Sequence, residues 1–407
     1  MSALSQNVRP LPKSLSYYVS RVAGFRRQTI KVLPQGTNAA QASSTLNILL
    51  PQNSLVDLST FAIFGYITGL DNTHYYPRNL DQALVQNLQI TVGGQQICSI
   101  QNYNQLMETL LTWNSGYAAR GRRSILQFAD GMRAASASDP VAIEGLLPLT
   151  GFKPTVIDTG LLGDVVITIT LAPSAIVQKN NVAGVSTYTL SSIYAAIDLI
   201  SFVDDSYSRL IREYVEGGGV LEIPFTSAYG YSMAASAAGQ NSSRFVISAN
   251  SIDMLVSTVV NEAYNTSPAV ALPTATMANS YYFTRVGSAV SQWAYTVNGS
   301  LTPAFYVPYE FTSQHNVNAL CQAGDLHSGS CMTYTDIPYN WATFLRLNAD
   351  LSGDEPGRYL SGLDTRSTNA QMEWLLTTTA GSLTMFTWAL MTSVLRVGAG
   401  RQVELVI

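Results

Sequence analysis

The chain contains only three histidines and three cysteines, and four of these six residues share one segment. His315, Cys321, His327 and Cys331 are residue types that ligate Zn²⁺. Zinc sites usually place two ligands on one turn, as in C-x-x-C or H-x-x-x-H, and these four residues match neither spacing. His74 is the only other histidine. We therefore expect packing or solvent-exposed roles for these side chains, and no bound metal or cofactor.

A second cluster consists of carboxylates. Asp350, Asp354 and Glu355 crowd the short segment DLSGDEP, which could bind Ca²⁺ or supply the paired carboxylates of a glycosidase. The spacing is not that of an EF-hand, and Asp, Gly and Pro together are typical of turns. The sequence contains no G-x-S-x-G elbow, phosphate-binding loop or dinucleotide fingerprint. We therefore predict a turn at this cluster and no catalytic residue in the chain.

Basic residues gather in a long loop of the first half. Arg120, Arg122, Arg123 and Arg133 form a patch that could contact nucleic acid. No stacking aromatics are interleaved with them, and no nucleic-acid-binding module is recognisable. Salt bridges between subunits, or a solvated loop, are therefore the favoured roles for this patch.

The amino-terminal segment is basic. The first 50 residues contain no Asp or Glu, whereas the whole chain carries 26 acidic and 22 basic residues. The basic residues expected to make contacts in or near this arm are Arg9, Lys13, Arg21, Arg26 and Arg27. A positive arm on an acidic body indicates that this arm faces a partner or an anionic layer.

Composition points to a protein that buries much of its surface. Hydrophobic residues make up 47% of the chain, but charged residues only 12%, about half of the roughly 25% usual in soluble domains. The polar surface must therefore be largely neutral. Neutral groups cost less to desolvate than charges, so this surface suits contacts between copies of the chain.

The cysteines do not suggest a disulfide framework. Cys98, Cys321 and Cys331 are the only three; Cys321 and Cys331 could pair across a loop, but reduced thiols are expected of a protein assembled inside a cell. The amino terminus lacks an apolar signal core. We expect the protein not to be secreted.

Alternation of apolar and polar residues predicts a mainly β structure. It is clearest over Thr45–Leu50, Leu88–Val92 and Val165–Leu171, as in half-buried strands. Noisier runs cover residues 28–33, 61–67, 195–203, 220–225, 244–249, 383–391 and 401–407. Gly93-Gly94 lies between two runs and predicts a tight hairpin turn.

Helices are expected at two places. One begins after Asn102 and ends near Asn114; the other begins at Asp204 or Asp205 and stops at Gly217-Gly218-Gly219. The uncharged stretch Trp374–Leu395 has the length of a membrane span. Its threonines and its turn at residues 380–382 predict two strands instead.

The second helix divides the chain into two β-rich halves of similar length. We expect an amino-terminal arm over residues 1–25, a first β-sandwich over 26–203, a linker helix with its glycine stop over 204–219, and a second β-sandwich over 220–407. The long connections 114–163 and 300–360 are expected to be irregular loops that form contact surfaces.

Several segments of the chain are distinctive when they are taken together. They are RQTIKVLP (27–34), LNILLPQNSLVDLS (46–59), VQNLQITVGGQQI (85–97) with YNQL (103–106), VIDTGLLGDVVITITLAP (156–173) and GVLEIPF (219–225). These segments resemble the double jelly-roll major capsid proteins of icosahedral double-stranded DNA viruses and of virophage- or polinton-like elements. The resemblance implies an all-β chain of two jelly rolls in tandem, homotrimers of pseudo-hexagonal outline, and no catalysis.

The expected function is therefore that of a major capsid protein in a virion. Its partners would be further copies of itself, minor capsid or penton proteins and, through the basic arm, an inner membrane or the genome. The two long connections would form outward towers of the shell. A glycan-binding spike or adhesin, and an all-β carbohydrate-active enzyme, are the alternatives that an all-β chain leaves open.

Overall fold

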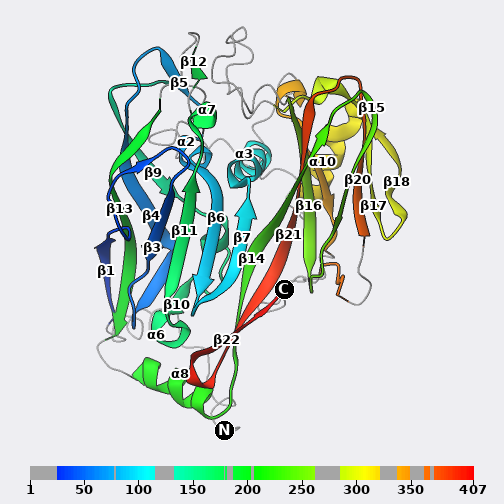
Figure 1. Ribbon diagram of the computed structural model, residues 1–407. Coiled ribbons are helices and arrows are strands. Elements are labelled where there is room, and N and C mark those ends of the chain that lie inside the picture. The colour runs from blue at the N-terminus through cyan, green and yellow to red at the C-terminus, as the bar shows by residue number, and fades with distance from the viewer. Residues whose placement is uncertain are drawn as a thin grey trace, which may run out of the picture.

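The computed structural model describes residues 25–77, 79–114, 133–177, 179–180, 187–202, 206–261, 285–320, 337–348, 362–366 and 371–407. Two β-sandwiches stand side by side, the first drawn in blue to green and the second in green to red (Figure 1). The helix α8 (Ser206–Glu216) lies between them in the chain.

The first sandwich is built from residues 25–202. Its strands are β1 (Phe25–Val32), β2 (Ala40–Gln41), β3 (Thr45–Leu49), β4 (Leu55–Thr68), β5 (His74–Tyr76), β6 (Val85–Val92), β7 (Gln95–Gln101), β8 (Arg133–Ala134), β9 (Ser138–Glu144), β10 (Val156–Asp158), β11 (Val165–Leu171), β12 (Lys179–Asn180) and β13 (Thr189–Phe202). Its helices are α2 (Leu80–Ala83), α3 (Tyr103–Asn114), α5 (Leu147–Thr150), α6 (Thr159–Leu162) and α7 (Ser174–Val177).

The second sandwich is built from residues 221–406. Its strands are β14 (Leu221–Ala235), β15 (Gly239–Val246), β16 (Ile252–Asn261), β17 (Val290–Val297), β18 (Ser300–Pro308), β19 (Thr343–Arg346), β20 (Gln371–Thr378), β21 (Leu383–Gly398) and β22 (Gln402–Val406). Its helices are α10 (Thr312–Leu320) and the short 3₁₀ turns η2 (Gly287–Ala289), η3 (Tyr309–Phe311), η4 (Ile337–Tyr339) and η5 (Ala399–Arg401).

Four antiparallel sheets carry the two sandwiches. Sheet A has the order β1-β13-β4, with β9 and β10 both on the far side of β4, and sheet B has the order β3-β11-β6-β7. Sheet D has the order β14-β21-β16-β19, with β22 on β21, and sheet E has the order β15-β20-β17-β18. A small sheet C joins β12, β5 and β8.

Both sandwiches have the same topology. When the main strands of each half are counted from one to eight in chain order, with β9 and β10 sharing sixth place, sheets A and D both read 1-8-3-6. Sheets B and E both read 2-7-4-5. Eight strands in two sheets with these crossovers form a jelly roll, and the expectation of two jelly rolls in tandem is confirmed.

The alternation in the sequence explains which face of each strand is buried. In β11, Val165, Ile167, Ile169 and Leu171 point into the core of the first roll, while the residues between them are half-exposed. The core of the second roll is more aromatic, with Trp293, Trp341 and Trp374 fully buried.

Several local predictions are confirmed. The turn between β6 and β7 places both Gly93 and Gly94 at positive φ, +56° and +83°, a conformation that glycine adopts without strain. Helix α3 spans the segment predicted after Asn102, and α8 ends just before Gly217. Residues 371–378 and 383–398 form β20 and β21, and within the described ranges no helix has the length and apolarity to cross a membrane.

The prediction that residues 114–163 and 300–360 are irregular was wrong over the described part of both segments. They contain β9, β10, β18, α10 and β19. Pro140 and Pro303 interrupt the alternation in β9 and β18, which hides these strands in the sequence. Both strands lie at a sheet edge, where a proline does not remove a ladder hydrogen bond.

Candidate functional site: the contact between the rolls and the exposed faces

Sheet D is covered on both faces. In β21, Met385 and Ala389 point into the core of the second roll, whereas Phe386, Trp388 and Leu390 point the other way and belong to the core cluster of the first roll. Side chains alternate along a strand, so a single strand serves both cores. The first roll therefore packs directly on the outer face of sheet D.

Helix α3 provides one part of this contact. The indole N–H of Trp113 donates to the Asn340 carbonyl at 2.9 Å, and its ring meets Phe344 edge-on at 5.9 Å between centroids. Arg285, which is fully buried, donates from its two terminal nitrogens to Thr109 Oγ1 at 3.4 Å and to Asn340 Oδ1 at 3.3 Å. The helix is thus held to the second roll by both aromatic packing and hydrogen bonds.

Strand β7 provides a second part, opposite the edge strand β14. Trp388 Nε1 donates to the Gln101 carbonyl at 3.2 Å. A Cβ added at Gly230 would lie 2.8 Å from Trp388 Cδ1 and 2.9 Å from that carbonyl oxygen. Glycine is therefore required at this position for the two rolls to approach so closely.

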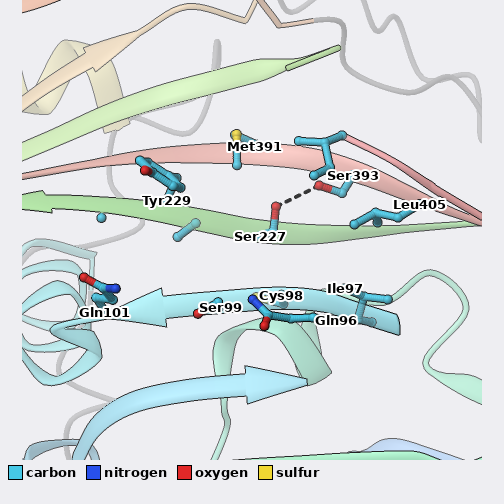
Figure 2. A pocket seen from close by; sticks show the side chains of 13 residues that line it. Gln96, Ile97, Cys98, Ser99, Gln101, Ser227, Tyr229, Met391, Ser393 and Leu405 are labelled. Atoms are coloured by element: carbon cyan, nitrogen blue, oxygen red, sulfur yellow. Dashed lines mark hydrogen bonds between the residues drawn. The ribbon is translucent and has the colours of Figure 1, made fainter. Parts of the chain in front are cut away.

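A cavity of about 310 Å³ lies farther along the same contact, between β7, β14, β21 and the carboxyl-terminal residues. Figure 2 shows Cys98 and Ser99 on one side of it and Ser227 on the other, with the hydroxyls of Ser227 and Ser393 joined at 2.8 Å. Burial raises the pKa of the Cys98 thiol to about 12, although the Ala228 backbone N–H bonded to its sulfur opposes the shift. Cys98 is thus an inert packing residue.

The segment after α5 provides the third part. Phe152 and Phe225 stack with centroids 4.7 Å apart, and the Lys153 backbone N–H donates to the Pro224 carbonyl at 2.9 Å. A Cβ at Gly151 would lie 3.0 Å from the Thr226 Cβ and backbone nitrogen. Together the three parts fix the two rolls as one unit.

The outer face of sheet A is aromatic, but no described residues cover it in the way that the first roll covers sheet D. Phe64 and Tyr194 stack at 5.3 Å, the Lys31 ammonium lies 4.5 Å from the Tyr194 ring centroid, and Tyr66 is 48% exposed. We call Lys31, Phe64, Tyr66 and Tyr194 the sheet A platform. In the sequence, this platform is indicated by large apolar residues on both faces of β4. Phe61, Ile63 and Ile67 fill the core, so Phe64 and Tyr66 lie on the opposite face.

A second exposed apolar face is formed by β18, η3 and α10. Phe305, Phe311 and Val317 are 54%, 60% and 41% exposed. The His315 ring lies edge-on to Phe305 at 5.9 Å and to the buried Trp293 at 6.0 Å. We call Phe305, Phe311, His315 and Val317 the α10 face. Exposed apolar clusters of this kind mark interaction surfaces.

The basic residues singled out in the sequence are only partly within the described structure. Arg26 is exposed on β1, and Arg27 pairs with two carboxylates of its own sheet, Asp57 at 2.9 Å and Asp198. Arg133 begins β8, but its side chain lies outside the described residues. Also outside them are Arg9, Lys13, Arg21, Arg120, Arg122 and Arg123.

The candidate metal and catalytic residues are not brought together. His74 is buried, and its Nδ1–H donates to Asp71 Oδ1 at 2.8 Å. His315 packs among aromatic rings. Among the residues that the structure describes, no group of three or more His, Cys, Asp or Glu side chains could hold a metal ion. Outside the described residues lie Cys321, His327, Cys331, Asp350, Asp354 and Glu355.

The Arg27 cluster predicts a pH dependence. Hydrogen bonds from the Thr29 hydroxyl and from Arg27 lower the pKa of Asp198. The ionised Asp198 carboxylate therefore stabilises the fold fully above the usual Asp pKa, which is about 4. This stabilisation is lost as the pH falls through the lower pKa that Asp198 has in the folded state. Because Arg27 is half-exposed, Asp198→Asn should cost about 1 kcal/mol or less in urea unfolding at neutral pH.

The free-energy difference between the wild type and this variant should stay constant from neutral pH to about pH 5 and shrink below about pH 4. Asp164→Asn, at another exposed carboxylate of the first roll, is a control for general acid effects. A difference for Asp198→Asn that grows on acidification would contradict the assignment.

Comparison with solved structures shows the same fold along nearly the whole chain. A chain of the PBCV-1 virus capsid is 13% identical, with 95% of this chain and 97% of that chain covered and a TM-score of 0.67. The Faustovirus major capsid protein is 9% identical, with 98% and 93% covered and a TM-score of 0.60. A chain of the Sputnik virophage is 12% identical, with 100% and 91% covered and a TM-score of 0.54.

No family model and no curated protein sequence matches the chain. The likeness is thus one of structure, with very little sequence identity. It extends over both sandwiches, and each sandwich has the strand order of a jelly roll. The chain therefore has the double jelly-roll fold of the viral capsid proteins to which it is similar.

Proposed function

We propose that the protein is the major capsid protein of an icosahedral virus and is a structural, non-catalytic subunit of the virion. The observation that carries this proposal is the repeated 1-8-3-6 and 2-7-4-5 strand order of this chain. The fold that it builds matches the Faustovirus major capsid protein over more than nine-tenths of both chains.

The way the rolls are joined supports an assembly role. Because sheet D is buried on both faces, each copy presents two rigidly connected rolls. Three copies would supply six rolls of one topology, which suits a capsomer of pseudo-hexagonal outline. The sheet A platform and the α10 face leave aromatic surface for contacts between copies.

The basic arm has a separate role in this proposal. Residues 1–24, with Arg9, Lys13 and Arg21, would contact neighbouring capsomers, minor capsid or penton proteins, or an anionic inner layer. The exposed Arg26 at the start of β1 is available for the same contacts, whereas Arg27 is engaged by Asp57 and Asp198. Arg120, Arg122, Arg123 and Arg133 are proposed to contact adjacent subunits.

Electron microscopy of the purified full-length protein tests the function. We expect trimers with a hexagonal outline, or shells. A variant lacking residues 1–24 should still form trimers but should fail to form shells, since the truncation ends before β1. A full-length protein that remains monomeric at micromolar concentrations would overturn the capsid proposal. Loss of folding in the truncated protein would overturn the proposal that the arm has a role separate from the folded rolls.

A further inference from the structure

One contact inside the chain has a counterpart that the described part of the chain leaves open. In the first roll, the fifth strand β7 and the helix that follows it, α3, pack on the outer face of the 1-8-3-6 sheet of the second roll, sheet D. The second roll has the same succession, with β18 as its fifth strand followed by η3 and α10. The first roll has the corresponding 1-8-3-6 sheet, sheet A.

From this duplication we infer that the α10 face of one copy packs on the sheet A platform of the next copy. The inference rests on the proposed function, because it names the surfaces through which capsomer subunits would meet. The occupant of the platform is a second copy of this chain, bound as the second roll is bound by the first.

The two faces are suited to each other chemically. The platform presents Tyr66 and the stacked Phe64 and Tyr194, and the α10 face presents Phe305 and Phe311. In the contact within the chain, the eighth strand of sheet D carries the aromatic pair Phe386 and Trp388, whose rings stack 5.7 Å apart. Aromatic side chains thus lie both on the outer face of sheet D, which the first roll covers, and on the sheet A platform.

Charge is complementary as well. Exposed Lys31 lies on the platform, over the Tyr194 ring, and exposed Glu310 lies in η3 beside Phe311. A pair of opposite charges at the rim of an interface favours the correct orientation and raises the rate of association.

The placement of the faces defines the type of assembly. Figure 1 shows β1 and β13 at one side of the molecule and β18 at the opposite side. Each copy therefore offers one face of each kind, and the contact is head-to-tail. Contacts of this kind form closed rings when the rotation closes, whereas a two-fold contact would pair each face with itself.

Two double variants test this arrangement. Phe305→Asp with Phe311→Asp removes the α10 face, and Lys31→Glu with Tyr66→Asp removes the platform. All four side chains are exposed, so folding should be preserved, and this is checked by thermal unfolding. Charging the centre of an interface usually weakens association about 30-fold or more. Each variant alone should therefore sediment as a monomer where the wild type is oligomeric.

Mixing the two variants provides the decisive measurement. One variant retains an intact platform and the other an intact α10 face, so a one-to-one mixture can form a single complete contact. Sedimentation velocity over a concentration series should then show dimers containing one chain of each variant, and nothing larger. A mixture that stays monomeric, or variants that assemble as the wild type does, would overturn the inference.

Val246→Asp is the matched control. Val246 is 58% exposed on β15, the edge of sheet E opposite to β18, and its replacement should leave assembly unchanged. Loss of assembly in this control would overturn the assignment to the α10 face. A wild-type protein that never oligomerises would instead overturn the proposed function. If the wild type assembles and both double variants assemble equally well, only the assignment of the contact to these two surfaces is overturned.

Discussion

Replacing Trp388 with alanine is expected to lower the free energy of unfolding by about 3 to 5 kcal/mol. Trp388 is fully buried at the contact between the rolls, where its ring stacks on Phe386 and its N–H donates to the Gln101 carbonyl. The change removes apolar contact, opens a cavity and leaves a buried acceptor without this donor. Urea unfolding followed by tryptophan fluorescence and by circular dichroism measures the loss.

Two further variants separate these causes. Trp388→Phe keeps an aromatic ring but removes the N–H, and should cost about 1 to 3 kcal/mol. Tyr229→Ala, at an exposed position one residue from Gly230 on the neighbouring strand, should change stability by about 0.5 kcal/mol or less. If Trp388→Ala were no more damaging than Tyr229→Ala, the close contact between the rolls would not stabilise the chain.

Replacing Asn316 with leucine is expected to cost about 2 to 4 kcal/mol. Asn316 is fully buried in α10; its amide nitrogen donates to the Ala342 carbonyl at 2.7 Å, and its oxygen accepts from the Phe344 N–H at 3.2 Å. Leucine has a similar size but can form neither bond. Two buried backbone groups next to β19 would lose their partner, and α10 would lose its anchor.

The experiment has a second readout, because α10 carries Val317 and directly follows Phe311, the last residue of η3. Asn316→Leu should weaken oligomer formation in sedimentation as well as lower the urea midpoint. Asn318→Leu is the matched control, since Asn318 is exposed on the same helix and should change stability by about 0.5 kcal/mol or less. Equal effects of the two substitutions would show that the amide of Asn316 does not anchor the helix.

Local structure could be predicted where one short segment contains all the necessary information. The alternation in Val165–Leu171 predicted β11, and the periodic apolar residues after Asn102 predicted α3. The aromatic pattern of β4 shows what such reasoning missed. Phe64 and Tyr66 were assigned to a strand, but nothing local shows that Tyr66 is exposed on a face that the rest of the described chain leaves open.

Edge strands were missed for a related reason. Strand β18 contains Pro303 and half-exposed residues on both faces, so its pattern is that of a loop. It becomes a strand through pairing with β17 alone. Similarly, the turn predicted at residues 380–382 lies between β20 and β21, but these two strands belong to different sheets.

The sequence by itself determined the β-rich character, the helices α3 and α8, the turn at Gly93-Gly94 and the low content of charged residues. Each of these features depends on composition or on residues close together in the sequence. Only the tertiary structure decided which strands pair, that both halves share one strand order, and that Phe386 and Trp388 lie between the rolls. These features depend on contacts between segments as distant as Gln101 and Trp388. Their energies arise only when the chain has brought both partners together, so no local pattern can encode them.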